Sequence, residues 1–92
     1  MKYDIATTAR FEKDLKTAKK RGLDLDELDG VVTKLANGEN LPPKNHDHPL
    51  AGEYKGTREC HIKPDWLLVY EKTDRLKLIT LLRTGSHSDI FG

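Results

Sequence analysis

Hydrophobic residues in the first third of the chain recur every three to four positions, which is the spacing of amphipathic helices. In residues 8–20 the apolar side chains that share one face are Phe11, Leu15 and Ala18. In residues 24–37 they are Leu25, Leu28, Val32 and Leu35. The pattern predicts two helices that form an αα-hairpin.

Residue types that begin and end helices stand at these boundaries. Thr8 can cap the first helix, and Gly22 ends it in the left-handed conformation that glycine adopts without strain. At the start of the second helix, the Asp24 carboxylate can accept a hydrogen bond from the Glu27 amide. Asn37-Gly38 then closes that helix.

Alternating apolar and polar residues predict four strands, at residues 2–6, 57–63, 66–71 and 75–83. Short turns at Pro64-Asp65 and Thr73-Asp74 join the last three strands into an antiparallel meander. The order β-α-α-β-β-β indicates an α+β fold with both helices packed on one face of a small twisted antiparallel sheet. The chain has 92 residues and no linker or repeat, so we expect one domain over residues 1–92.

Composition limits the cellular setting. No apolar run approaches the ~20 residues that span a bilayer, and the N-terminus lacks the layout of a secretory signal. We therefore expect a cytoplasmic protein with no membrane contact. The single cysteine, Cys60, cannot form an internal disulfide, and its place on the apolar side of a strand predicts a packing role.

The stretch "ECHIKPDW" raises the question of chemistry. His61 shares a strand face with Glu59 and Lys63, where a histidine of the apolar core would not lie. All four histidines lie outside the predicted helices, at positions 46, 48, 61 and 87. Each can be a solvated surface residue, but together they permit either a zinc site or metal-free acid–base catalysis.

The zinc alternative would use His46 and His48 with His61 or Asp65. The spacing is generic, the chain offers no second thiolate, and neighbouring basic residues disfavour a cation. We therefore predict no metal and no cofactor.

Metal-free cleavage of RNA needs a base, an acid for the leaving 5′-oxygen and a cation for the phosphorane. Histidine serves as either acid or base near neutrality, and arginine binds phosphate oxygens in a bidentate manner. Aromatic side chains hold unstacked bases. The residues that can fill these roles are His48, His61, Asp65, Arg83, His87, Trp66 and Phe91.

Three motifs resemble one family in combination: "DHPL" at 47–50, "RECHIKPDWLLVY" at 58–70 and "LLRTGSHSDIFG" at 81–92. They are similar to those of the YafQ branch of the RelE superfamily, and the resemblance covers essentially the whole chain. It implies the RelE-like microbial RNase fold and a type II toxin that cuts messenger RNA on the ribosome.

The resemblance also implies the site. The family's active-site histidines fall on His48, His61 and His87, its acidic position on Asp65, and its phosphate-binding arginine on Arg83. The remaining matched positions are aromatic, Phe91 at the C-terminus and Trp66, for which packing is the alternative. His87 is our choice for the general acid, whereas the base stays open among Asp65, His61 and His48. His46 has no matching role.

Partners follow from the same resemblance. They are mRNA on the 70S ribosome, a DinJ-like antitoxin that forms an inactive complex, and operator DNA through the antitoxin alone. Basic residues outnumber acidic ones six to two between positions 10 and 21, so Lys13, Lys16 and Lys20 on one helix face suit 16S or 23S rRNA phosphates. A solvated face, balanced by the acidic start of the second helix, is the alternative for these lysines.

Two other functions remain open. A gyrase inhibitor of the ParE type shares the scaffold but not this histidine set, which argues against it. An inactive toxin that acts only as a binding module or co-repressor with its antitoxin is the second, and the complete set of catalytic groups argues against that.

Overall fold

A five-stranded mixed sheet forms the centre of the computed structural model, which describes residues 1–92. The strand order is β1-β5-β4-β3-β2. The strands are β1 (Asp4–Thr7), β2 (His48–Pro49), β3 (Arg58–Lys63), β4 (Trp66–Thr73) and β5 (Leu78–Gly85). The helices are α1 (Ala9–Lys20), α2 (Leu25–Ala36) and α3 (His87–Phe91), with 3₁₀ turns η1 (Pro43–Asn45) and η2 (Gly52–Tyr54).

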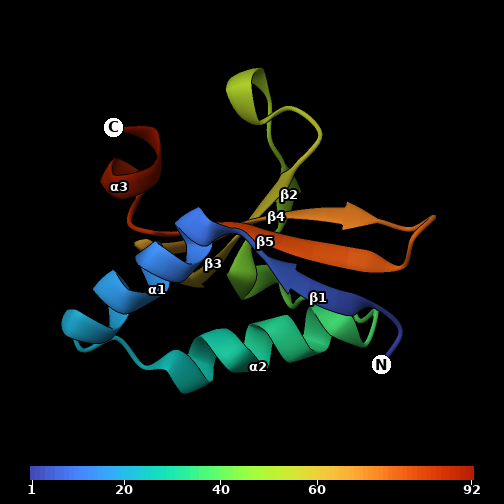
Figure 1. Ribbon diagram of the computed structural model, residues 1–92, viewed down its shortest axis with the longest axis horizontal. Coiled ribbons are helices and arrows are strands. Elements are labelled where there is room, and N and C mark those ends of the chain that lie inside the picture. Colours follow the sequence, from blue (N-terminus) through green and yellow to red (C-terminus); the bar gives the residue numbers. More distant parts are fainter.

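The helices divide between the two faces of the sheet. α1 and α2 cover one face, whereas α3 and the loop that contains η2 lie on the other (Figure 1). The predicted α+β class is therefore confirmed, and the predicted elements occur in the order β-α-α-β-β-β, with β2 and α3 in addition. The sheet is not purely antiparallel as predicted, because β1 pairs in parallel with β5.

The local capping chemistry explains where α1 and α2 begin. The Thr8 hydroxyl accepts a hydrogen bond from the Phe11 amide at 3.0 Å, as expected for an N-cap residue. The Asp24 carboxylate accepts from the Asp26 amide at 3.0 Å, and not from the Glu27 amide as predicted, because the Glu27 amide bonds the Asp24 carbonyl. Gly22 has a φ of +77°, the left-handed conformation predicted after α1.

The main core lies between α1, α2 and the sheet. The sheet residues that α1 and α2 bury are Cys60, Ile62, Trp66, Leu68, Tyr70, Ile79 and Leu81. A smaller cluster on the opposite face comprises Leu67, Val69 and Ile90, with Leu50, Tyr54 and Leu82 packed against it. Burial of each large apolar side chain stabilises the fold by about 1.5–3 kcal/mol. This smaller cluster holds α3 and the η2 loop against the open face.

A β-bulge in β5 changes which face its residues occupy. Tyr70 pairs with Leu81, but the adjacent Val69 pairs with Arg83, so Leu82 is an extra residue. Leu81 therefore belongs to the core under the helices, while Arg83 lies level with Val69 on the open face. Strict alternation along the strand would put Arg83 on the same face as Ile79 and Leu81, and the bulge breaks that alternation.

The ends of the other elements differ modestly from the predictions. The last strand begins at Leu78 because residues 74–77 form the turn, where Lys77 adopts a positive φ of 52°. Neither the two-residue β2 nor α3 was predicted.

None of the helices is long and apolar enough to cross a membrane.

Candidate active site

Pairing between β2 and β3 brings two of the candidate histidines to one carboxylate. His48 lies directly opposite Glu59 in the sheet, and His61 follows Glu59 by two residues on the same strand face. The Glu59 Oε1 atom lies 3.6 Å from His48 Nε2 and 3.3 Å from His61 Nε2. Only 5% of the Glu59 surface is exposed, so the two imidazoles are its main polar partners.

Backbone carbonyls orient both imidazole rings. His48 Nδ1 lies 2.6 Å from the His46 carbonyl oxygen, and His61 Nδ1 lies 3.2 Å from the Pro64 carbonyl oxygen. A carbonyl oxygen only accepts, so each Nδ1 carries a proton and donates it. In both rings Nε2 is therefore the nitrogen that can gain or lose a proton, and in both rings Nε2 faces Glu59.

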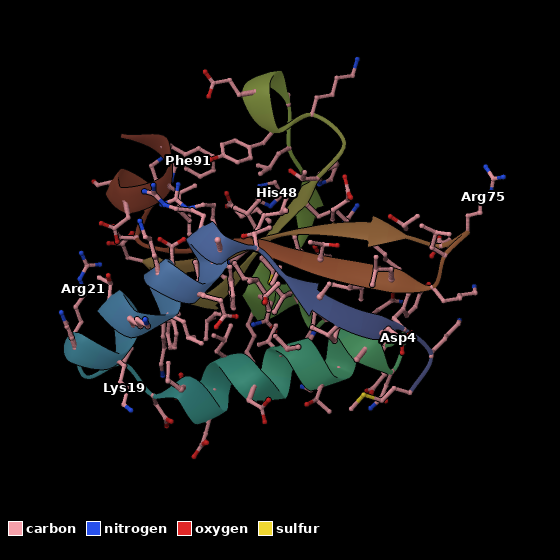
Figure 2. The ribbon with its side chains drawn as sticks, viewed as in Figure 1. Asp4, Lys19, Arg21, His48, Arg75 and Phe91 are labelled. Carbon is pink, nitrogen blue, oxygen red and sulfur yellow. The ribbon has the colours of Figure 1, made fainter.

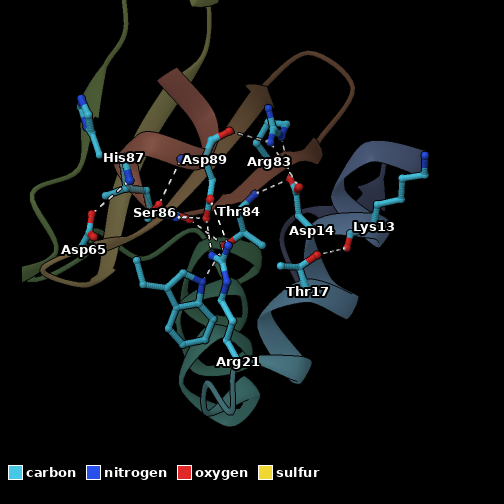
Figure 3. Close-up of polar contacts among 12 residues, drawn as sticks. Lys13, Asp14, Thr17, Arg21, Asp65, Arg83, Thr84, Ser86, His87 and Asp89 are labelled. Atoms are coloured by element: carbon cyan, nitrogen blue, oxygen red, sulfur yellow. Dashed lines mark hydrogen bonds and ion pairs between the residues drawn. The ribbon is translucent and has the colours of Figure 1, made fainter. Parts of the chain in front are cut away.

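The turn between β3 and β4 connects this pair to the C-terminal segment. Asp65 accepts a hydrogen bond from the His87 backbone amide at 3.1 Å (Figure 3). The Pro64 carbonyl in the same turn binds His61, so a single turn positions His61 and the start of α3.

The aromatic residues form a chain beside α3. The His87 and Phe91 rings lie 4.9 Å apart between centroids, and Phe91 meets Tyr54 edge to face at 5.5 Å. Phe91 remains 37% exposed, so part of this residue is accessible to a ligand. Figure 2 shows Phe91 and His48 on the side of the sheet away from α2.

Ion pairs with α1 anchor Arg83 at the edge of this face. Its Nε donates to Asp14 Oδ2 at 2.7 Å and its Nη2 to Asp14 Oδ1 at 3.3 Å. Nη2 also donates to the Asp89 carbonyl at 3.3 Å, which connects Arg83 to α3. The hydrogen bonds that Arg83 donates to Asp14 raise the pKa of Arg83 further above its usual range.

A second ion pair anchors α3 itself. Arg21 donates to the two carboxylate oxygens of Asp89 at 2.5 and 3.2 Å (Figure 3). Asp89 also completes a capping box with Ser86 at the start of α3. The bonds from Arg21, followed by those from Ser86, hold the pKa of Asp89 well below its usual range.

The structure therefore brings most of the predicted residues to one face. His48 and His61 meet at Glu59, while Asp65 and His87 meet at the β3–β4 turn. Arg83 reaches the same helix, α3, that carries His87 and Phe91.

Trp66 is not available as a nucleotide-binding residue. Its side chain is only 2% exposed, and its indole nitrogen donates to the Thr84 hydroxyl at 2.9 Å within the core under the helices. Base stacking needs an exposed ring face. The packing alternative is therefore the one that the structure supports.

The basic residues of α1 lie apart from this face. Lys13, Lys16 and Lys20 are exposed, and no ion pair engages them. Figure 3 shows Lys13 extending away from the network of Asp14 and Arg83. Their predicted contact with rRNA stays a prediction.

Two site residues were not among the predicted ones. The sequence analysis placed Glu59 on the same strand face as His61, two residues away, and this spacing was the one signal for it. Its contact with His48 depends on the unpredicted strand β2. Asp14 gave no signal, because 69 residues separate it from Arg83.

The zinc alternative does not match the geometry. No group of three or more histidine, cysteine, aspartate or glutamate side chains is arranged so that it could hold a metal ion. The rings of His46 and His61, both named in that alternative, meet in a T-shaped arrangement at 5.4 Å between centroids.

The fold and the site define a class of small α+β domains that gather histidines, carboxylates and an arginine on the open face of a mixed sheet. These groups suit general acid–base chemistry at a phosphate ester. Residues 3–92 match the protein-family model of YafQ, a bacterial toxin of type II toxin–antitoxin systems. The chain belongs to this YafQ family, which confirms the resemblance found in the sequence.

Known relatives cover almost the full length. The chain is 43% identical over 90 residues to the mRNA interferase toxin YafQ of Escherichia coli K12, which covers 97% of this chain and 96% of that protein. The crystal structure of YafQ from E. coli BL21(DE3) superposes with a TM-score of 0.92 at 42% identity, over 98% of this chain and 99% of that one.

Two further similar structures contain an antitoxin or a metal. The E. coli DinJ–YafQ toxin–antitoxin complex matches with a TM-score of 0.89 at 42% identity over all of both chains. A metal-bound toxin from Helicobacter pylori matches with a TM-score of 0.91 at 48% identity, over 97% of this chain and 99% of that one.

Proposed function

We propose that this chain is an mRNA interferase, an endoribonuclease that cleaves messenger RNA on the ribosome and thereby inhibits translation. The name of the E. coli relative supports the activity. The observation that carries the proposal is the buried Glu59 between the Nε2 atoms of His48 and His61, on the same face as His87 and Arg83. This face holds the groups that metal-independent cleavage through 2′-hydroxyl attack requires.

In this mechanism the His48–Glu59–His61 group removes the proton of the attacking 2′-hydroxyl. The Glu59 carboxylate accepts hydrogen bonds and donates none when ionised, so it can hold an imidazole through a hydrogen on Nε2. His61 is the nearer ring, and its side chain is 25% exposed against 46% for His48. We assign the retained proton to His61 and the role of general base to His48.

Asp65 then acts by positioning. One of its carboxylate oxygens already accepts the His87 amide hydrogen, which fixes the first residue of α3. A carboxylate engaged in that bond is a weaker candidate for the base than the His48 imidazole, whose Nε2 accepts no hydrogen bond within the protein.

The remaining groups act on the phosphate and the leaving oxygen. His87 is exposed at the start of α3 and serves as general acid for the 5′-oxygen. The Nε and Nη2 atoms of Arg83 are bonded within the protein, which leaves Nη1 for a phosphate oxygen. Phe91, a residue that is 37% exposed, stacks on a base.

The partners follow from the same proposal. Ribosome binding uses Lys13, Lys16 and Lys20 on the exposed side of α1, where phosphates of 16S or 23S rRNA neutralise them. A cognate antitoxin similar to DinJ binds the toxin, and the E. coli DinJ–YafQ toxin–antitoxin complex supports this pairing. In the proposal the antitoxin inactivates the toxin and alone contacts operator DNA. A toxin that acts on ribosomes works in the cytoplasm, which is the location we propose.

Primer extension on a translated message tests the activity. Wild type is compared with His87→Ala, with and without ribosomes, and Ser88→Ala is the control because Ser88 is the exposed neighbour on the same helix. We expect cutting only on ribosomes, a loss of about 10²–10⁴-fold for His87→Ala, and wild-type cutting by Ser88→Ala.

The outcomes separate the alternatives. Equal cutting by wild type and His87→Ala removes His87 from the mechanism. No cutting by any of the proteins contradicts the nuclease proposal and favours a binding module, or a gyrase inhibitor if supercoiling by gyrase is blocked instead.

A further inference from the structure

A basic hollow adjoins His61 on the side away from α3. It has a volume of about 470 Å³, and its walls come from η1, the residue after it, and the end of β3. The lining residues are Lys44, Asn45, His46, His61, Ile62, Lys63 and Pro64. Two lysines and two histidines line it, and no carboxylate does. The hollow near Arg83 differs, because Asp14 and Asp89 offset the arginines there.

The hollow continues toward α2. A second depression of about 280 Å³ shares Lys44, Asn45, Ile62 and Lys63 with the first and extends to Gly30 and Lys34. Glu27 is its single carboxylate, and it pairs with Lys63 at 2.9 Å. The two depressions together form a groove, here called the basic groove, that begins at His61 and ends on α2.

The wall of the basic groove is held in place by specific contacts. Asn45 is 5% exposed, and its side-chain amide donates to the His61 carbonyl at 2.6 Å, which fixes η1 against β3. His46 then adopts a left-handed conformation with a φ of 44°, which is costly for a residue other than glycine. This conformation directs the His46 carbonyl to His48 Nδ1 and the His46 ring to His61.

His46 therefore touches both histidines of the catalytic pair while its own ring remains exposed. Lys44, two residues earlier, is exposed and belongs to no ion pair. An unpaired cation and an aromatic ring beside a phosphate-cleaving site are the elements with which proteins bind single-stranded RNA.

We propose that the basic groove binds the RNA strand on one side of the scissile phosphate. Lys44 and Lys63 contact the phosphates of the nucleotides next to the cut, and the His46 ring stacks on a flanking base. His46 is then a residue that influences which nucleotide is accepted beside the cut. This inference rests on the proposed nuclease function and specifies how its substrate is held.

Cleavage rates on programmed ribosomes test the groove. The messages differ only in the nucleotides that flank the cut, and single-turnover rates are measured for wild type, Lys44→Glu and His46→Ala. Arg75→Glu is the matched charge-reversal control, because Arg75 is exposed in the β4–β5 turn far from His48 (Figure 2). Thermal unfolding of every variant confirms that each is folded.

The two variants have different expected signatures. Lys44→Glu lowers the rates on all messages by a similar factor, on the order of tenfold, and weakens their dependence on salt, as expected for a phosphate contact. His46→Ala narrows the spread of rates among the messages, as expected for loss of a base contact. A merely structural role of His46 would lower all rates equally.

If the wild type cuts and both variants keep its rates and its spread of rates among messages, the basic groove does not bind the RNA. The nuclease proposal would then remain intact. An equal loss on all messages in His46→Ala overturns the base contact. A wild type that does not cut overturns the nuclease proposal, and this inference with it.

Discussion

Replacement of Asp14 by asparagine tests the physical account of how Arg83 is held. The Asp14 carboxylate accepts from Arg83 Nε, from Arg83 Nη2 and from the Thr84 backbone amide at 3.1 Å. The Asp14 and Arg83 side chains are only 11% and 13% exposed. Asparagine keeps the shape but leaves a guanidinium without its counter-charge in a site that water barely reaches.

The magnitude follows from the partial burial. Removal of one partner from a fully buried ion pair costs about 3–5 kcal/mol. Some water reaches both groups here, so we expect Asp14→Asn to lower the free energy of unfolding by about 2–3 kcal/mol. For a domain of this size that corresponds to a decrease in Tm of about 10–20 °C. Total stabilities of about 5–15 kcal/mol leave the variant folded at room temperature.

Urea unfolding followed by circular dichroism measures this change. Arg10→Ala is the control, because Arg10 approaches Asp14 only to 3.7 Å and is 63% exposed; its loss should cost less than about 0.5 kcal/mol. A cycle that adds Arg83→Gln and the double variant isolates the pairwise coupling energy, which we expect to exceed about 1 kcal/mol. An Asp14→Asn midpoint equal to that of Arg10→Ala, with an unchanged m-value, would refute the reasoning.

Two further predictions concern ionisable groups. Burial raises the pKa of Cys60 to about 12, so a thiol-reactive dye should leave the folded protein unlabelled and modify one thiol after unfolding; labelling of the folded protein at the unfolded rate would contradict this. Because the bonds from Arg21 and Ser86 depress the pKa of Asp89 in the folded state, Asp89 stabilises the fold above the ordinary carboxyl range and loses this effect as the pH falls below about 4. The difference in Tm between wild type and Asp89→Asn should therefore shrink from pH 7 to pH 3, and a constant difference would show that Asp89 does not act through its charge.

Features that depend on neighbours in the chain were predictable. Thr8 and Gly22 mark the ends of α1 because capping is decided within a few residues. The short turn at Pro64-Asp65 likewise follows from local turn chemistry. The resemblance to a known family supplied the histidines, which no periodicity could have assigned to catalysis.

Features that depend on pairing across the sheet were not predictable. The parallel pairing of β1 with β5 joins residues more than seventy positions apart, so no local sequence pattern predicts it. The role of Glu59 depends on a two-residue strand that brings His48 opposite it. The burial of Trp66 depends on Thr84, which faces the helices only because Leu82 is an extra residue in β5.

The extra residue at Leu82 divides β5 into two segments with separate constraints. Residues before it, such as Ile79 and Leu81, pack under the helices, whereas Arg83 belongs to the reactive face. Substitutions in the first segment can therefore alter stability while the reactive groups keep their geometry. Chain length behaves differently, because a residue lost elsewhere in the strand, such as Thr80, would exchange the two faces on one side of the deletion, whereas loss of Leu82 would remove the bulge and leave Arg83 opposite Val69. In a comparison of homologues, we therefore expect insertions and deletions in this strand to be confined to the position of Leu82.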